Sequence, residues 1–150
     1  MSIFVDTSAL YALMVAEDVH HQAAVSCFEE LRVLDAKLVS TNYVLLECAS
    51  LIQRRQGFES AKTVLTRTAA LLDVMWIGQE AHHEAVQLWT RAKSRTLSLV
   101  NCTSFSTMRV HGIRRAVAFD DHFVQAGFEV LPRGDRVAEP RGVYRVARRS

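Results

Sequence analysis

Short apolar runs alternate with longer stretches in which apolar residues recur about every 3.6 positions. The longer stretches predict helices, and the short runs predict strands. Helices are expected after residue 7 and over 24–34, 43–56, 58–72, 79–95 and 105–110, with a helical turn at 122–127. Strands are expected at 3–5, 37–40, 73–77, 97–100, 116–119 and 128–131. This alternation predicts an α/β fold with a central, mostly parallel sheet and helices on both faces.

The first strand ends abruptly at a carboxylate, Asp6, and the next helix has Thr7 and Ser8 as possible N-cap residues. In open α/β sheets, ligands bind outside the carboxyl ends of the strands. An acidic residue at this position is therefore a candidate functional residue, although an N-cap role alone would also explain it.

Composition indicates one domain in a reducing compartment. The chain has 150 residues, of which 49% are hydrophobic, enough for a single substantial core. It has no apolar run of the roughly 20 residues that a membrane helix needs, and no signal-peptide pattern. Three widely spaced cysteines, Cys27, Cys48 and Cys102, fit neither a disulfide framework nor a zinc site, so we expect a cytoplasmic protein without a membrane partner.

Charge divides the chain into two parts. Residues 1–132 contain 12 basic and 14 acidic residues, a net charge of −2, whereas residues 133–150 contain 6 arginines and 2 acids, a net charge of +4. We therefore expect a folded domain over 1–132 and a basic C-terminal tail over 133–150. The tail suits a polyanion or an acidic partner, and it could be mobile or serve solubility.

Three predicted strands are followed at once by a short acid or its amide: Asp6, Asn101 and Asp120. In a parallel sheet these side chains would share one edge. Glu47, on the mostly apolar side of its helix, could join them. Clustered carboxylates repel one another unless a cation neutralises them, and oxygen ligands favour Mg²⁺ or Mn²⁺. Such a site suits metal-assisted hydrolysis of a phosphodiester.

Four segments with these residues resemble the PIN-domain family, and most closely its VapC-type toxins from bacterial toxin–antitoxin pairs. The segments are 4–10, 42–47, 97–105 and 119–123, the last followed by Gly127-Phe128. The resemblance implies a PIN fold over 1–132, Mg²⁺- or Mn²⁺-dependent endoribonuclease activity, a VapB-like antitoxin partner and homodimers. The substrate it implies is RNA, without a distinction between tRNA, rRNA and mRNA.

The resemblance also assigns residues. It places Asp6, Glu47, residue 101 and Asp120 in the catalytic and metal-binding positions. Polar residues nearby are candidates for supporting these groups or positioning substrate: Thr7, Ser8, Asn42, Ser104, Asp121 and His122. Arg54 and Arg55, at the end of the Glu47 helix, are candidates for contacts with RNA phosphates.

One position departs from the family pattern, because Asn101 stands where the family has aspartate. An amide lacks the negative charge that holds a divalent ion, so we expect a nuclease in an inactivated form. Three alternatives remain open. The chain could be a catalytically silent module that binds RNA or protein, or Asn101 could simply be an N-cap. The third alternative is a phosphatase with Asp6 as nucleophile, but such sites usually have a second acidic residue at the position that Ser8 occupies here.

Overall fold

The computed structural model describes residues 1–133, so the predicted basic tail lies outside the described residues apart from Arg133. In chain order the elements are β1 (Ser2–Val5), α1 (Thr7–Met14), α2 (His21–Val33), β2 (Lys37–Thr41), α3 (Asn42–Gln56), α4 (Phe58–Thr63), η1 (Val64–Thr68), η2 (Ala69–Leu71), β3 (Asp73–Met75), α5 (Gln79–Ala92), α6 (Leu99–Val110), β4 (Arg115–Val117), α7 (His122–Gln125) and β5 (Glu129–Leu131).

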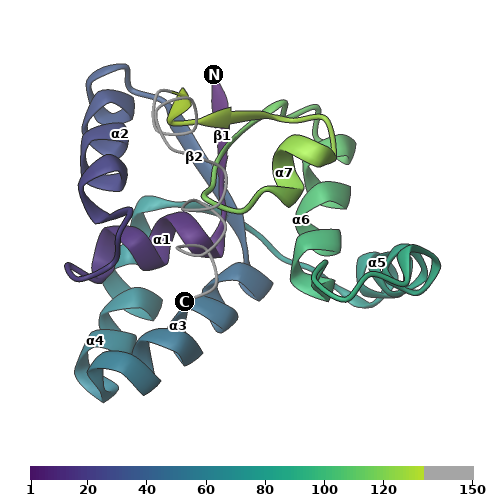
Figure 1. Ribbon diagram of the computed structural model, residues 1–150, viewed down its shortest axis with the longest axis horizontal. Coiled ribbons are helices and arrows are strands. Elements are labelled where there is room, and N and C mark those ends of the chain that lie inside the picture. Colours follow the sequence, from purple (N-terminus) through teal and green to yellow (C-terminus); the bar gives the residue numbers. More distant parts are fainter. Residues whose placement is uncertain (134–150) are drawn as a thin grey trace.

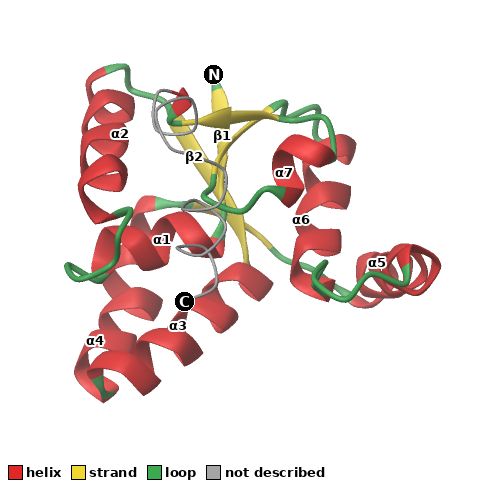
Figure 2. Ribbon diagram, in the orientation of Figure 1, coloured by secondary structure: helices red, strands yellow, loops and turns green. Residues whose placement is uncertain are grey.

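The strands of the described residues form one five-stranded sheet in the order β3-β2-β1-β4-β5, and all four ladders are parallel. Figure 2 shows the strands in the middle of the molecule, between the helices. The order reverses direction beside β1, between β2 and β4. The carboxyl end of β1 therefore lies at a switch point of the sheet, where α/β proteins bind ligands.

Helices cover both faces of this sheet. Right-handed crossovers place α1 to α4 on one face and α5 to α7 on the other, and Figure 1 shows α1 and α2 on the opposite side of the strands from α6 and α7. Phe4 of β1 and Phe123 of α7 are fully buried, with ring centroids 6.4 Å apart. Phe105 of α6 meets Phe123 edge-on at 4.9 Å, which joins the second layer to the sheet.

The predicted α/β fold with a parallel sheet is confirmed, but one strand is wrong. Residues 97–100 form no strand, because Leu99 begins α6 and Ser98 is its N-cap. A four-residue stretch with three apolar residues does not distinguish a buried strand from the first turn of a buried helix. The helix predicted over 105–110 therefore begins six residues earlier, and Asn101 comes from a helix instead of a strand end.

Smaller differences concern element ends. The stretch predicted as one helix over 58–72 changes to a π-helical turn at 64–68 and a 3₁₀ turn at 69–71. The third strand ends at Met75 instead of residue 77. The helix predicted from residue 43 begins at Asn42, and Thr41 is its N-cap, since the Thr41 hydroxyl accepts the Val44 N–H at 3.1 Å. Within residues 1–133, no helix is both long and apolar enough to cross a membrane.

Candidate active site

Asp6 lies at the carboxyl end of β1 and is the N-cap of α1, one of three N-cap candidates in the sequence beside Thr7 and Ser8. Its Oδ2 atom accepts two hydrogen bonds from Ser8, from the backbone N–H at 3.1 Å and from the hydroxyl at 2.6 Å. The Ser8 hydroxyl in turn accepts the Phe119 N–H at 2.9 Å. Ser8 thereby fixes Asp6 relative to the segment that leads to Asp120.

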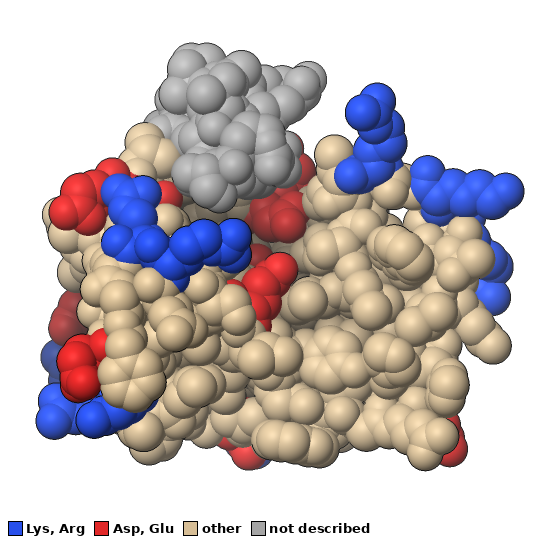
Figure 3. All heavy atoms as spheres, turned by 90° about the horizontal axis from the view of Figure 1, so that it is seen from below, with Lys and Arg blue, Asp and Glu red and all other residues tan. Residues whose placement is uncertain are grey.

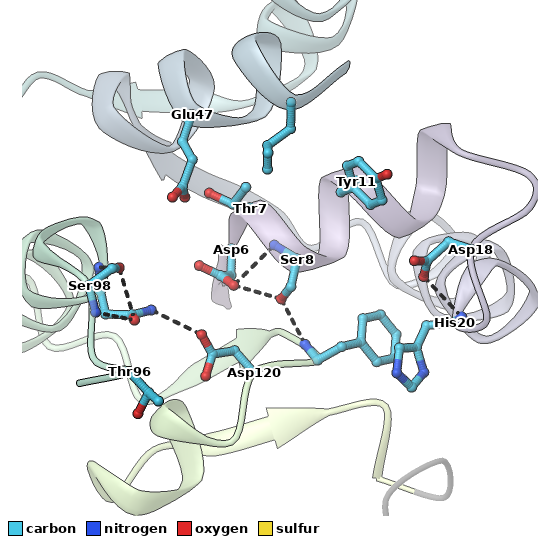
Figure 4. A pocket seen from close by; sticks show the side chains of 13 residues that line it. Asp6, Thr7, Ser8, Tyr11, Asp18, His20, Glu47, Thr96, Ser98 and Asp120 are labelled. Atoms are coloured by element: carbon cyan, nitrogen blue, oxygen red, sulfur yellow. Dashed lines mark hydrogen bonds between the residues drawn. The ribbon is translucent and has the colours of Figure 1, made fainter. Parts of the chain in front are cut away.

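The three predicted acids line one pocket, although they come from separate elements. Asp6, Glu47 and Asp120 all border a cavity of about 210 Å³ at the carboxyl edge of the sheet. Figure 4 shows Glu47 extending from α3 toward Asp6 and Thr7, with Asp120 on the opposite wall. Asp6 is 3% exposed, whereas Glu47 and Asp120 are half-buried.

Burial and like charge change the protonation of Asp6. The pKa of this carboxyl is raised from 3.8 to about 7, first by removal from water and then by the negative charges of Asp120 and Glu47, while the Ser8 hydrogen bonds oppose the rise. The folded chain therefore binds a proton at Asp6 more tightly than the unfolded chain does. A cation in the pocket would remove the same repulsion.

Asn101 occupies this pocket with its amide already engaged. Its Oδ1 accepts hydrogen bonds from the Ser98 N–H at 3.1 Å and the Ser98 hydroxyl at 3.0 Å, and Ser98 Oγ accepts the Asn101 N–H at 3.0 Å. This is a reciprocal capping box, with Asn101 at the third helical position. The Nδ2 group donates to Asp120 Oδ2 at 3.3 Å. Asn101 thus offers the pocket an N–H donor, and its oxygen faces Ser98.

We expect Ser98→Ala to lower the free energy of unfolding by about 1 kcal/mol, because it removes the N-cap of α6. Chemical denaturation measures this difference. Ser106→Ala on the same helix is the matched control, since no hydrogen bond of the Ser106 side chain is seen within residues 1–133. Equal effects of the two substitutions would contradict the capping role.

Several predicted residues lie around the pocket wall. Thr7 and Ser8 line the cavity. His122 lies behind Asp120, whose Oδ1 accepts its backbone N–H at 2.9 Å and contacts its Nδ1 at 2.7 Å. Asp121, next in the chain, is half-buried at the N-cap of α7.

Other predicted residues lie away from the cavity. Asn42 bonds the backbone of Ile77, accepting its N–H at 2.6 Å, and so ties α3 to the segment after β3. Ser104 is fully buried in α6. Arg54 and Arg55 are exposed in the last turn of α3.

The pocket is also lined by five polar residues that were not predicted from the sequence: Tyr11, Asp18, His20, Thr96 and Ser98. His20 is buried, and its ring stacks on Phe119 at 4.4 Å. Its neighbour His21 points elsewhere, with Nδ1 2.8 Å from the Ala12 oxygen. The spacing of Ser98 and Asn101 was the one available signal, since it matches a capping box.

Comparisons with known proteins define the class of this fold and site. The family model for the PIN domain matches residues 3–129. The chain therefore belongs to the PIN-domain family, and it is of the VapC type.

The similar proteins share one name, VapC20. The chain is 35% identical over 132 residues to the 23S rRNA-specific endonuclease VapC20 in two strains of Mycobacterium tuberculosis, CDC 1551 and H37Rv. The alignment covers 87% of this chain and 98% of each relative. The crystal structure of M. tuberculosis VapC20, described as a toxin that cleaves the sarcin–ricin loop, superposes with a TM-score of 0.74 at 34% identity. This structural match covers 84% of this chain and 95% of the VapC20 chain in the crystal structure.

Proposed function

We propose that this fold is built as a divalent-metal-dependent endoribonuclease toxin, in which Asp6, Glu47 and Asp120 hold Mg²⁺ or Mn²⁺. One observation carries the proposal: three carboxylates from separate elements border one cavity, where burial and their mutual repulsion raise the pKa of Asp6 to about 7. A bound ion would orient and activate a water molecule and offset the charge of the RNA phosphate.

The donor chemistry of the pocket fits such an ion. Besides the carboxylates, the buried hydroxyl of Thr7 lines the cavity and has no hydrogen-bond partner within residues 1–133. No three Asp, Glu, His or Cys side chains of these residues are already arranged to hold a metal ion. An ion would therefore have to draw the carboxylates inward, as its charge would allow.

The residues around the acids would position them. Ser8 holds Asp6 by its hydroxyl, and His122 holds Asp120 by a backbone N–H and its ring. These contacts leave Asp6 Oδ1 without a hydrogen bond among the described residues and free to face the cavity. Fixed carboxylates need less reorganisation when they bind a cation or a substrate water.

Asn101 would inactivate this site in the present chain. The amide supplies a neutral N–H to Asp120 where aspartate would supply a negative oxygen. We infer that a chain with aspartate at position 101 is the active form and that RNA cleavage by Asn101→Asp in the presence of Mn²⁺ tests the function. The second candidate, a catalytically silent module that binds RNA or protein, is favoured by the same hydrogen bond, because it satisfies Asp120 without an ion.

The relatives support a proposal for the substrate. VapC20 is described as specific for 23S rRNA, and we propose an RNA substrate of the same class. As partners we propose a cognate VapB-like antitoxin and a second copy of the chain in a homodimer. The three buried cysteines are free thiols, which supports a reducing cytoplasm as the site of action. Arg54 and Arg55 remain candidates for phosphate contacts.

Stabilisation of the protein by Mn²⁺ should increase with pH. The ion needs ionised Asp6, and a proton competes for this carboxyl until the pH exceeds about 7. Below that value the apparent affinity should rise up to about tenfold per pH unit. Thermal denaturation with and without Mn²⁺ should therefore show a small increase in Tm near about pH 5.5 and a larger one near about pH 8. A pH-independent increase would place the ion away from Asp6.

A further inference from the structure

A second hollow adjoins the acidic pocket. It lies between α5, α6 and α7 and has a volume of about 400 Å³. Thr96 lines both cavities, and His122, which contacts Asp120, lines the second. We call this second cavity the α5–α7 groove. If an RNA strand places a phosphate beside Asp120, a neighbouring nucleotide of that strand would therefore reach the α5–α7 groove.

The lining of the groove suits a flat, weakly polar group. Leu88, Leu97 and Phe105 supply apolar contacts. Arg109 lies over the Phe105 ring, with its Cζ 5.9 Å from the centroid, and donates one hydrogen bond to the Ala126 oxygen at 3.3 Å. Within residues 1–133 the Arg109 guanidinium forms no other hydrogen bond and the Gln125 amide forms none, so both can meet the edge of a base. Unpaired bases are bound in this way, by stacking and by edge hydrogen bonds.

A basic loop held by side-chain hydrogen bonds separates the groove from the pocket. Ser94 Oγ accepts the N–H groups of Thr96 at 3.1 Å and Leu97 at 3.0 Å. Thr96 Oγ1 lies 3.0 Å from His122 Nε2, so the loop is tied to the residue behind Asp120. Lys93 and Arg95 project from this loop and are exposed.

The charge of this loop complements RNA. No carboxylate within residues 1–133 forms an ion pair with Lys93 or Arg95. Figure 3 shows the carboxyl edge of the sheet, with acidic side chains in a central hollow and basic side chains on either flank. Since the acidic pocket itself repels phosphate, cations on its rim are needed to hold a polyanion.

We propose that the α5–α7 groove binds an unpaired nucleobase next to the cleaved phosphate, while Lys93 and Arg95 bind the RNA backbone. This inference rests on the proposed function, because it assumes that the acidic pocket receives RNA. It assigns the groove as a substrate subsite and the loop as the contact that directs the strand into it.

Binding of two ligands of equal length tests the proposal: an oligoadenylate of about ten nucleotides and a ribose-phosphate chain of the same length without bases. Fluorescence anisotropy measures the Kd of each in the presence of Mn²⁺. The unaltered chain should bind the oligoadenylate roughly tenfold more tightly, the size of one stacked base. Ala92→Leu, which narrows the groove from an exposed position on α5, should reduce this preference to less than about twofold and leave binding of the abasic chain unchanged.

The double variant Lys93→Gln/Arg95→Gln should weaken binding of both ligands about 20-fold at about 0.1 M salt. It should also reduce the slope of log K against log salt concentration by about 1.4, the value for two phosphate contacts on a single strand. Ala70→Leu controls for the added bulk. Arg32→Gln/Arg114→Gln controls for charge, since both arginines are exposed away from the carboxyl edge of the sheet, Arg32 in the last turn of α2 and Arg114 directly before β4.

Three results would overturn the inference. The unaltered chain could bind both ligands equally tightly, or Ala92→Leu could retain the preference for the ligand with bases. The third is that Ala92→Leu weakens only the binding of an antitoxin protein. Cleavage by Asn101→Asp is measured separately. A chain that cleaves RNA but shows no base preference refutes the subsite alone. A chain that shows the preference but never cleaves refutes the nuclease and leaves the subsite.

Discussion

Asn101→Asp should raise the rate of RNA cleavage in the presence of Mn²⁺ by about 10²–10³-fold, the order expected when a missing electrostatic group is restored to a catalytic site. In the present chain the amide donates to Asp120 across 3.3 Å, so the two side chains satisfy each other without a cation. A carboxylate at position 101 replaces this hydrogen bond by repulsion, which only a cation or a proton can relieve.

The same substitution should make the metal-free protein less stable. Two carboxylates in contact cost free energy, and we expect a decrease in Tm without metal that Mn²⁺ reverses. Asn101→Ala is the matched control, because it removes the amide without adding an acid and should not cleave RNA. Cleavage by the unaltered chain at the rate of Asn101→Asp would show that the charge at this position is unnecessary.

Asp6→Asn should stabilise the metal-free protein at about pH 8 by about 2–4 kcal/mol and abolish cleavage in the Asn101→Asp background. The folded-state pKa of Asp6 is about 7, against 3.8 for an ordinary aspartate. Because the folded chain binds this proton more tightly, stability falls as the pH rises from about 4 to 7 and levels off above that. At about 1.4 kcal/mol per pKa unit, the full cost of ionisation is about 4 kcal/mol. Asparagine avoids this cost of ionisation, and its amide oxygen can still accept the Ser8 N–H.

The pH dependence distinguishes this effect from general stabilisation. Urea denaturation should show a difference between Asp6→Asn and the unaltered chain that is large near about pH 8 and almost absent near about pH 4. Glu17→Gln removes an exposed charge and should show no such trend. A destabilising effect of Asp6→Asn at about pH 8 would mean that burial and the charges of Asp120 and Glu47 do not destabilise the ionised Asp6 carboxylate.

The sequence predicted the sheet and two of the acids for simple reasons. Asp6 directly follows β1, and Asp120 is the third residue after β4, so strand direction places both at the carboxyl edge of the sheet. Glu47 could be placed by helical spacing, since its neighbours one turn away are apolar. Strand and helix periods are local properties, and they determined most of the fold.

The parts that sequence reasoning missed depend on contacts between distant residues. Asn101 was expected at a strand end, because residues 97–100 contain three apolar residues and resemble a short strand, whereas in the structure Ser98 caps a helix that begins at Leu99. His20 lines the pocket with its ring stacked on Phe119, which lies almost 100 residues later in the chain. Thr96 becomes a wall residue through its contact with His122. No periodicity within one segment contains this information.

A crystal structure of the Asn101→Asp chain grown with Mn²⁺ tests the central claim most directly, because anomalous scattering locates the ion. We predict an anomalous peak within about 2.5 Å of carboxylate oxygens from both Asp6 and Asp120, with Glu47 turned toward it. A peak elsewhere, or carboxylates that hold their present positions around a pocket without Mn²⁺, would contradict the account.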